Sequence, residues 1–212
     1  MIAWKSVTLP KSKGGLGLAS FDSIQHKMIC SFIFRMYNES NFVGDWYRGK
    51  FDSIWETPPT YASKFWKLVC QTTASFPHNV TLSVHRNCKL SFLWDPWCDN
   101  KLVADFYYSP SLAHLKVNEC ITHNQWTLPD CVPSTSRTII MKTAIGEEQP
   151  VLYWDGSSNP SSREFMSSWN DDLEDVVWSK FIWHKGYVLH YACYAWMALL
   201  GKLKTADNLI SR

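Results

Sequence analysis

The sequence predicts a mainly helical α+β fold with one or two short β-hairpins, arranged in two lobes. Three observations lead to this prediction. Apolar residues recur at intervals of three and four over residues 20–37, 61–72 and 190–200, as on the buried face of a helix. Apolar and polar residues alternate over residues 80–92, as in half-buried strands. Glycine, proline and serine punctuate the intervening stretches, and the one at 147–162 predicts the joint between the lobes.

The first helix is predicted directly after a cluster of glycines. Ser20 or Asp22 can cap it. Its predicted buried face consists of Ile24, Met28, Ile29, Phe32, Ile33 and Met36. Residues 44–61 are punctuated by glycines and end at the pair Pro58-Pro59, and the second helix is predicted beyond that pair. Pro77 is expected to close that second helix.

A β-hairpin is predicted next, because Val80, Leu82 and Val84 alternate with polar residues before a polar turn, and Leu90 and Phe92 alternate after it.

The second half of the chain is expected to be more irregular. Short helices are predicted at 109–117 and 136–146, with an irregular stretch between them. A glycine- and serine-rich loop then precedes a long helix predicted at 164–183, and the last helix is predicted at 190–200.

Composition narrows the class of protein. The formal net charge is +2, yet residues 1–50 hold seven Lys/Arg against three acids, and residues 180–212 hold five against one, so both ends are basic. Seven cysteines without a CxxC pair argue against a disulfide framework. The start of the chain lacks a secretory signal, and no apolar run reaches the ~18 residues of a membrane span. An intracellular protein, nuclear or cytoplasmic, is expected, with no membrane partner.

The stretch "PKSKGGLGLASF" (10–21) fits neither of two phosphate-binding templates. A dinucleotide fingerprint needs a third glycine where Ser20 stands, and a Walker loop needs its lysine after the glycines, whereas Lys11 and Lys13 precede them. A structural turn is therefore favoured over a nucleotide site.

Acidic residues supply two local groups for acid–base or two-metal chemistry. Asp95 and Asp99 lie at a predicted turn among aromatic residues, while Asp171, Asp172 and Asp175 suit the solvated first turns of the helix predicted at 164–183. Asp155, before a glycine, is expected to form a turn. Structural roles are favoured for all of them, and an enzyme built on Asp95 and Asp171 would require these two regions to meet in one cleft.

The sequence offers little evidence for a metal site or for a catalytic nucleophile. His184 and His190, with Cys193 nearby, are the best metal suggestion, but two or three ligands do not complete a tetrahedral site. No nucleophile elbow is present. No metal, cofactor or small-molecule substrate is expected.

Nucleic-acid contact is the remaining option. Lysines lie near both ends, and Trp4, Trp178, Trp183 and Trp196 offer stacking surfaces, although aromatics at helical spacing more often fill a core.

The order of the motifs is more informative than any one of them. Trp4 and Val7 precede "PKSKGGLGL", then follow "KLSFLWDPW" (89–97), "QWTLP" (125–129) and finally "VVWSKFIW…YAWMALLGKLKTADNL". This succession resembles the C-terminal region of plant-type non-LTR (LINE-type) retrotransposon reverse transcriptases, running into the start of the reverse-transcriptase zinc-binding domain.

The resemblance implies a connection-like region at 1–146, a linker at 147–162 and a truncated start of the zinc-binding domain at 163–212. It would place the polymerase aspartates before residue 1 and the zinc ligands after residue 212. The implied function is therefore a non-catalytic fragment with at most weak, sequence-tolerant RNA or DNA binding, through Lys11, Lys13, Lys202 and Lys204. The alternative is a stand-alone, tryptophan-rich module that binds a protein or RNA partner; the oligomeric state is left open.

Overall fold

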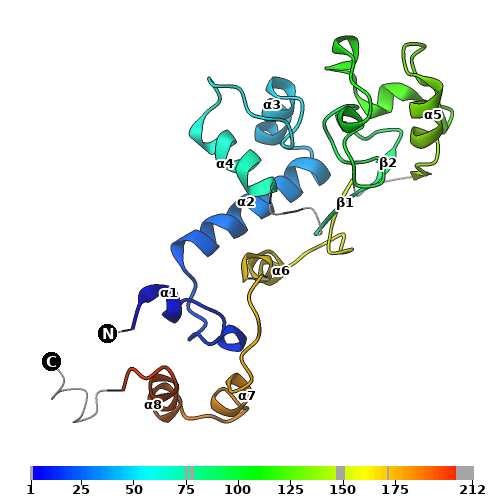
Figure 1. The fold of residues 1–212 in the computed structure, drawn as a ribbon. Coiled ribbons are helices and arrows are strands. Elements are labelled where there is room, and N and C mark those ends of the chain that lie inside the picture. The colour runs from blue at the N-terminus through cyan, green and yellow to red at the C-terminus, as the bar shows by residue number, and fades with distance from the viewer. Residues whose placement is uncertain (1, 75, 77–78, 147–150, 171, 204–212) are drawn as a thin grey trace. The chain divides into compact units, whose positions relative to one another are not determined.

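The computed structural model describes residues 2–74, 76, 79–146, 151–170 and 172–203. It has the expected α+β fold, mainly helical, with short strands in two-stranded sheets (Figure 1). The α-helices are α1 (Trp4–Val7), α2 (Phe21–Asn38), α3 (Phe42–Lys50), α4 (Lys64–Thr73), α5 (Ser134–Ile140), α6 (Ser162–Ser167), α7 (Ser179–Ile182) and α8 (Leu189–Leu199). The strands are β1 (Val80–Leu82), β2 (Val84–His85), β3 (Ile121–Thr122), β4 (Gln125–Trp126), β5 (Ile145–Gly146) and β6 (Leu152–Trp154). Single 3₁₀ turns are η1 (Lys11–Lys13), η2 (Val103–Asp105), η3 (Pro110–Leu112), η4 (Val117–Cys120) and η5 (Ser168–Asn170).

The chain divides into two compact units. The core unit comprises His26–Phe165, and the end unit combines Met1–Gln25 with Met166–Arg212. Among the described residues, 2–25 therefore fold together with those between 166 and 203. These units do not coincide with the segments 1–146, 147–162 and 163–212 that the family resemblance implies, and that division stays a prediction.

Helices α2 and α4 confirm the two predictions made from apolar spacing. In α2, Ile29, Ile33 and Met36 are buried, whereas the expected Ile24 and Met28 are exposed. The buried stripe is thus displaced around the helix, since Ser23, His26 and Cys30 are buried instead. In α4, the Ser63 hydroxyl accepts a 3.1 Å bond from the backbone N–H of Trp66 and caps the helix start.

Helix α3 lies in the glycine-punctuated stretch, for which no helix was predicted. The side chain of Asn41 caps this helix by accepting a 2.7 Å bond from the backbone N–H of Gly44. The helix is retained through packing: Trp66 of α4 stacks on Tyr47 and Phe51, with ring centroids 4.8 and 4.7 Å apart. Tertiary contacts thus outweigh the local cost of the glycines.

The hairpin predicted at 80–92 is wrong. Strand β1 pairs antiparallel with the distant β6, and β2 pairs parallel with β5. The reason is that alternation identifies a half-buried strand but not its partner. The side chain of Asn38, at the end of α2, holds the start of β6: its Oδ1 accepts from the backbone N–H groups of Val151 and Leu152 at 2.9 Å, and its Nδ2 donates to the Leu152 carbonyl at 2.8 Å.

A hairpin does form where an irregular stretch was expected. Strands β3 and β4 are joined by His123 and Asn124, which have φ values of 51° and 62°. Two consecutive positive φ angles characterise the tight turn that matches strand twist. Around it, the helix expected at 109–117 is replaced by the 3₁₀ turns η3 and η4, and the one expected at 136–146 is the shorter α5 followed by β5.

The long helix predicted at 164–183 is also wrong, because the chain breaks into α6, η5 and α7. Between η5 and α7 the backbone N–H of Val176 donates a 2.8 Å bond to the carbonyl of Ser12 instead of to its own helix. Helix α8 confirms the prediction at 190–200 to within a residue. The expected helix end at Pro77 lies outside the described residues.

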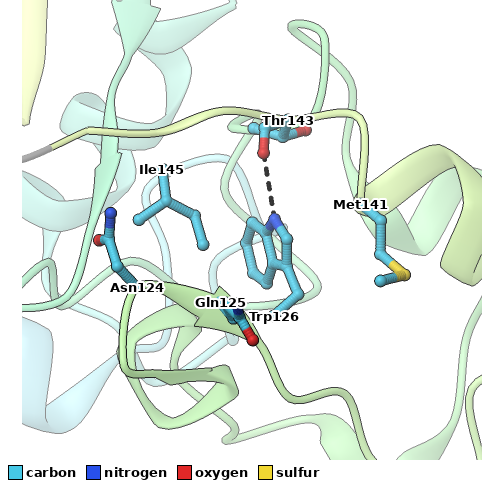
Figure 2. A pocket seen from close by; sticks show the side chains of 6 residues that line it. All are labelled: Asn124, Gln125, Trp126, Met141, Thr143 and Ile145. Atoms are coloured by element: carbon cyan, nitrogen blue, oxygen red, sulfur yellow. Dashed lines mark hydrogen bonds between the residues drawn. The ribbon is translucent and has the colours of Figure 1, made fainter.

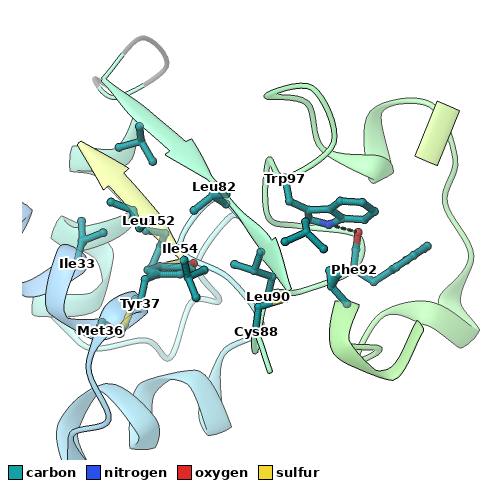
Figure 3. Packing of buried hydrophobic residues seen from close by; sticks show 14 of the residues in the cluster. Ile33, Met36, Tyr37, Ile54, Leu82, Cys88, Leu90, Phe92, Trp97 and Leu152 are labelled. Atoms are coloured by element: carbon teal, nitrogen blue, oxygen red, sulfur yellow. Dashed lines mark hydrogen bonds between the residues drawn. The ribbon is translucent and has the colours of Figure 1, made fainter. Parts of the chain in front are cut away.

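The hydrophobic core of the core unit lies between α2, the β1–β6 pair and the turn at residues 88–97. Figure 3 shows Ile33 and Met36 of α2 on one side of this cluster and Leu90, Phe92 and Trp97 on the other. The end unit has a small core of its own, formed by Ile182, Ala192 and Trp196 with partly buried neighbours.

Candidate nucleic-acid interface

The lysine- and glycine-containing loop at residues 10–17 packs on the C-terminal segment of the end unit. The indole N–H of Trp196 in α8 donates a 2.8 Å hydrogen bond to the carbonyl of Gly14, and this bond is buried. Gly14 has a φ of +89°, and a Cβ at this position would lie 3.3 Å from the ring of Trp178. Two of the stretches on which the resemblance rests, the glycine loop and the C-terminal segment that contains Trp196, therefore contact each other.

The backbone amides of this loop are used by its own turns. The N–H groups of Lys13 and Gly15 both donate to the Pro10 carbonyl, at 2.9 and 3.0 Å, and that of Gly17 donates to Leu9 at 2.9 Å. A phosphate-binding loop instead points its N–H groups at the ligand. The prediction of a structural turn is confirmed.

Lys11 and Lys13, the first two predicted nucleic-acid contacts, have partners within the end unit. The Nζ of Lys11 lies 4.9 and 4.5 Å from the ring centroids of Trp183 and Tyr187, and it donates to the Tyr187 hydroxyl at 2.5 Å. The Nζ of Lys13 lies 3.2 Å from Asp175 Oδ1 and also donates to the carbonyl of Leu173. Both cations therefore hold the loop against the C-terminal segment.

The other two predicted contacts follow α8. Lys202 is exposed, and its backbone N–H donates to the Met197 carbonyl at 2.9 Å. Lys204 lies outside the described residues. The structure thus brings Lys11 and Lys13 together in η1 and places Lys202 in the same unit.

Of the four tryptophans proposed as stacking surfaces, three are packed into the end unit. Trp196 is buried, and Trp178 and Trp183 are partly buried against its core. Trp4 remains 64% exposed. It is the member of this set that is available to a ligand.

Trp4 also lines a cavity of about 670 Å³ in the end unit, which sequence reasoning did not find. Its lining comes from three separate segments: Trp4, Lys5, Thr8, Leu9, Ser20, Phe21, Asp22, Trp169, Asn170, Asp172 and Leu173. No local motif connects these segments, so the sequence offered no direct signal beyond the excess of aromatic residues.

A shallower pocket of about 370 Å³ lies on the β3–β4 hairpin of the core unit (Figure 2). It is lined by Trp126 and Gln125 of the "QWTLP" motif, with Met141 and Ile145 nearby. The Trp126 indole donates a 3.0 Å bond to the Thr143 carbonyl and its ring stacks on Trp97, with centroids 5.3 Å apart. The motif is therefore part of the packing of this region.

The candidate catalytic carboxylate Asp95 is buried in a turn, at 1% exposure. Its Oδ1 accepts from the hydroxyls of Tyr37 and Ser53, at 3.0 and 2.6 Å, and its Oδ2 accepts from the backbone N–H of Ser91 at 2.7 Å. Burial raises the pKa of Asp95 to about 6, although these hydrogen bonds oppose the shift. Asp99, its proposed partner, is exposed in a neighbouring turn with a φ of 56°. Asp95 therefore organises the "FLWDPW" turn.

The remaining acidic candidates occupy loops. Asp155, with a φ of 47°, forms the expected turn and accepts a 2.8 Å bond from Asn79 Nδ2. Asp172 and Asp175 are exposed, and they lie in the break after η5 rather than on the helix that was predicted there. Asp171 lies outside the described residues.

Histidine and cysteine show no assembled site in the described part of the chain. No group of three His, Cys, Asp or Glu residues there could hold a metal ion. His184 and His190 are exposed, and the ring of His190 packs on Tyr194 with centroids 4.8 Å apart. Burial raises the pKa of the Cys30 and Cys120 thiols to about 12, which disfavours the thiolate form.

Two further findings complete the description. Within the described ranges, no helix combines the length and apolar character that crossing a bilayer requires. No protein-family model matches the sequence, and comparisons with curated proteins and with solved structures give no match.

Proposed function

We propose that this chain is a non-catalytic part of a retrotransposon reverse-transcriptase-like protein that contacts RNA or DNA weakly and without sequence preference. The observation that carries the proposal is the contact between Trp196 and Gly14, at 2.8 Å. It joins the two stretches that carry the resemblance most specifically, although 182 positions separate them. Because the two stretches pack against each other, their occurrence in the same chain has a structural explanation. Such a protein would act in the nucleus or cytoplasm.

The phosphate contacts would come from lysines on the end unit. Lys202, one of the predicted contacts, is exposed, and so are Lys5, Lys180 and Lys185. Lys11 and Lys13 would have to leave their internal partners to reach a phosphate. Lys202, Lys5, Lys180 and Lys185 are therefore more accessible to a phosphate than Lys11 and Lys13.

A salt titration with a single-stranded RNA oligonucleotide tests the proposal. Each phosphate contact on a single strand contributes about −0.7 to the slope of log K against log salt concentration. Lys202→Met should flatten the slope by about that amount and leave the melting temperature unchanged. Lys11→Met should instead lower stability by about 0.5–2 kcal/mol, because it removes a cation held against two aromatic rings.

Two results would contradict the proposal. Binding that does not depend on salt would remove the electrostatic basis for the contact. Robust primer extension in the presence of Mg²⁺ or Mn²⁺ would show that the chain is an enzyme.

A second candidate function, a stand-alone module for a protein or RNA partner, is favoured by the apolar side chains that α7 and α8 expose. Phe181, Leu189 and Tyr191 are each more than 60% exposed. Apolar surface of this kind often marks a partner interface. This candidate predicts a cooperative melt of an independently folded monomer, whereas the fragment proposal is also compatible with an unstable, aggregating chain.

A further inference from the structure

The 670 Å³ cavity of the end unit lies where α1, the start of α2 and the segment around η5 meet. Its volume falls within the range of about 300–1,000 Å³ that is usual for small-molecule sites. All of its lining residues belong to the end unit, so the cavity does not depend on the placement of the core unit.

Three aromatic side chains line this cavity: Trp4, Phe21 and Trp169. Trp4 is 64% exposed and Phe21 is 78% exposed, which is unusual for residues of this size. Aromatic faces that are open to solvent serve as platforms on which nucleic-acid bases stack, whatever the base. The walls of the cavity therefore suit a flat heterocycle.

The charged groups of the cavity nearly balance. The lining includes one lysine, Lys5, and two carboxylates, Asp22 and Asp172, for a formal net charge of −1. Asp22 lies in the first turn of α2, where the positive end of the helix dipole offsets its charge. The cavity thus has no concentrated positive field for a phosphate and no strong negative field for a free cation. A neutral polar ligand fits this balance better than either ion.

We propose that this cavity holds a single base of a single-stranded nucleic acid, with the phosphates outside it, on the exposed lysines. The inference rests on the proposed function and names the part of the nucleic acid that this site takes. Asp22 and Asp172 accept hydrogen bonds, and the amide of Asn170 can also accept one. Bases with an exocyclic amino group (adenine, cytosine or guanine) are therefore preferred over uracil.

The experiment compares three labelled ligands of equal length by fluorescence anisotropy with the full chain: oligo(A), oligo(U) and an oligomer of abasic sugar-phosphate units. Oligo(A) should bind more tightly than oligo(U), and both more tightly than the abasic oligomer. Trp4→Leu should weaken binding of oligo(A) by about 5- to 150-fold, the range expected for loss of one stacked base. Its salt slope should not change, because the phosphate contacts remain.

The matched control is Trp46→Leu, which removes a half-exposed tryptophan from α3 in the core unit. It should leave oligo(A) binding unchanged, and Trp4→Phe should restore most of the affinity lost in Trp4→Leu. Circular dichroism melts of all three variants check that they fold. The free riboside of 2-aminopurine, whose fluorescence is quenched by stacking, tests the cavity without phosphates.

The possible results distinguish the base site from the proposed function. Equal binding of oligo(A) and the abasic oligomer, or an unaffected Trp4→Leu variant, would overturn the base site and leave the proposed function standing. If no oligomer binds but the riboside is quenched in a Trp4-dependent manner, the proposed function fails and the base site is overturned as a nucleic-acid site, because the cavity then takes a free nucleoside only. If neither oligomer nor riboside binds, or if a basic peptide alone occupies the cavity, the base site is overturned.

Discussion

The indole N–H of Trp196 donates a buried 2.8 Å hydrogen bond to the backbone carbonyl of Gly14, across 182 positions of sequence. A helix near one end of the chain is thereby attached to a loop near the other. The adjacent bond from the Val176 N–H to the Ser12 carbonyl, at 2.8 Å, strengthens this attachment. The buried core residues of the end unit, Ile182, Ala192 and Trp196, come from the C-terminal segment, and Ile2, Val7 and Leu16 of the N-terminal segment pack against them.

Trp196→Phe should destabilise the end unit by about 1–3 kcal/mol, because it leaves the buried Gly14 carbonyl without a donor. Hydrogen exchange at the amides of Ile182 and Ala192 would report this loss. Trp46→Phe, on the exposed side of α3, is the matched control and should have little effect there. Unchanged protection of both amides in Trp196→Phe would show that the bond contributes nothing to stability.

Two glycines should respond to alanine in opposite directions. A Cβ at Gly15 would overlap the backbone carbonyl of Leu9, so Gly15→Ala should destabilise the protein by about 1–3 kcal/mol. A Cβ at Gly49, within α3, meets no atom within 4 Å. Gly49→Ala should therefore stabilise by about 0.5–1 kcal/mol, since alanine loses less backbone freedom on helix formation. Urea denaturation of both variants measures the difference, and a shift of the same sign in both would contradict the local geometry.

Local periodicity was sufficient to predict α2, α4 and α8. Each of these helices carries enough apolar side chains at helical spacing to specify its buried stripe within one segment, and α4 also has a serine cap. The main fold class follows from such segments, which is why it was correctly predicted.

Pairing between distant segments was not predictable in the same way. Val80 faces Trp154 of a strand far along the chain, and the backbone of that strand is bound by the side chain of Asn38, which belongs to neither strand. The break after η5 likewise arises because Val176 bonds to Ser12 in the opposite part of the chain. Helix α3 exists because Trp66 stacks against it. In each case a partner remote in sequence determines the local structure.

Some features of the candidate site could be predicted from the sequence, and others could not. The structural role of the glycine loop could be predicted because its residue spacing fits neither phosphate-binding motif, and that spacing lies within one short segment. The partners of Lys11 were invisible in the sequence, because Trp183 and Tyr187 lie more than 170 positions away. The cavity at Trp4 was missed for the same reason: Phe21 and Trp169 join it only after folding.

Asp95 should make the stability of the protein depend on pH in an unusual direction. Its pKa in the folded chain is about 6, above the ordinary value of 3.8, because burial penalises the carboxylate. The folded state therefore holds its proton more tightly than the unfolded state does. The contribution of protonated Asp95 to the free energy of unfolding is fully present below pH 4. It is lost as the pH rises through 6, by roughly 3 kcal/mol.

Asp95→Asn should remove this decrease in the free energy of unfolding, as measured by urea denaturation between pH 4 and 7. Asp99→Asn, at an exposed turn where asparagine tolerates the positive φ, should retain it. If Asp95→Asn and the unmodified protein showed parallel pH profiles, Asp95 would not be the titrating group.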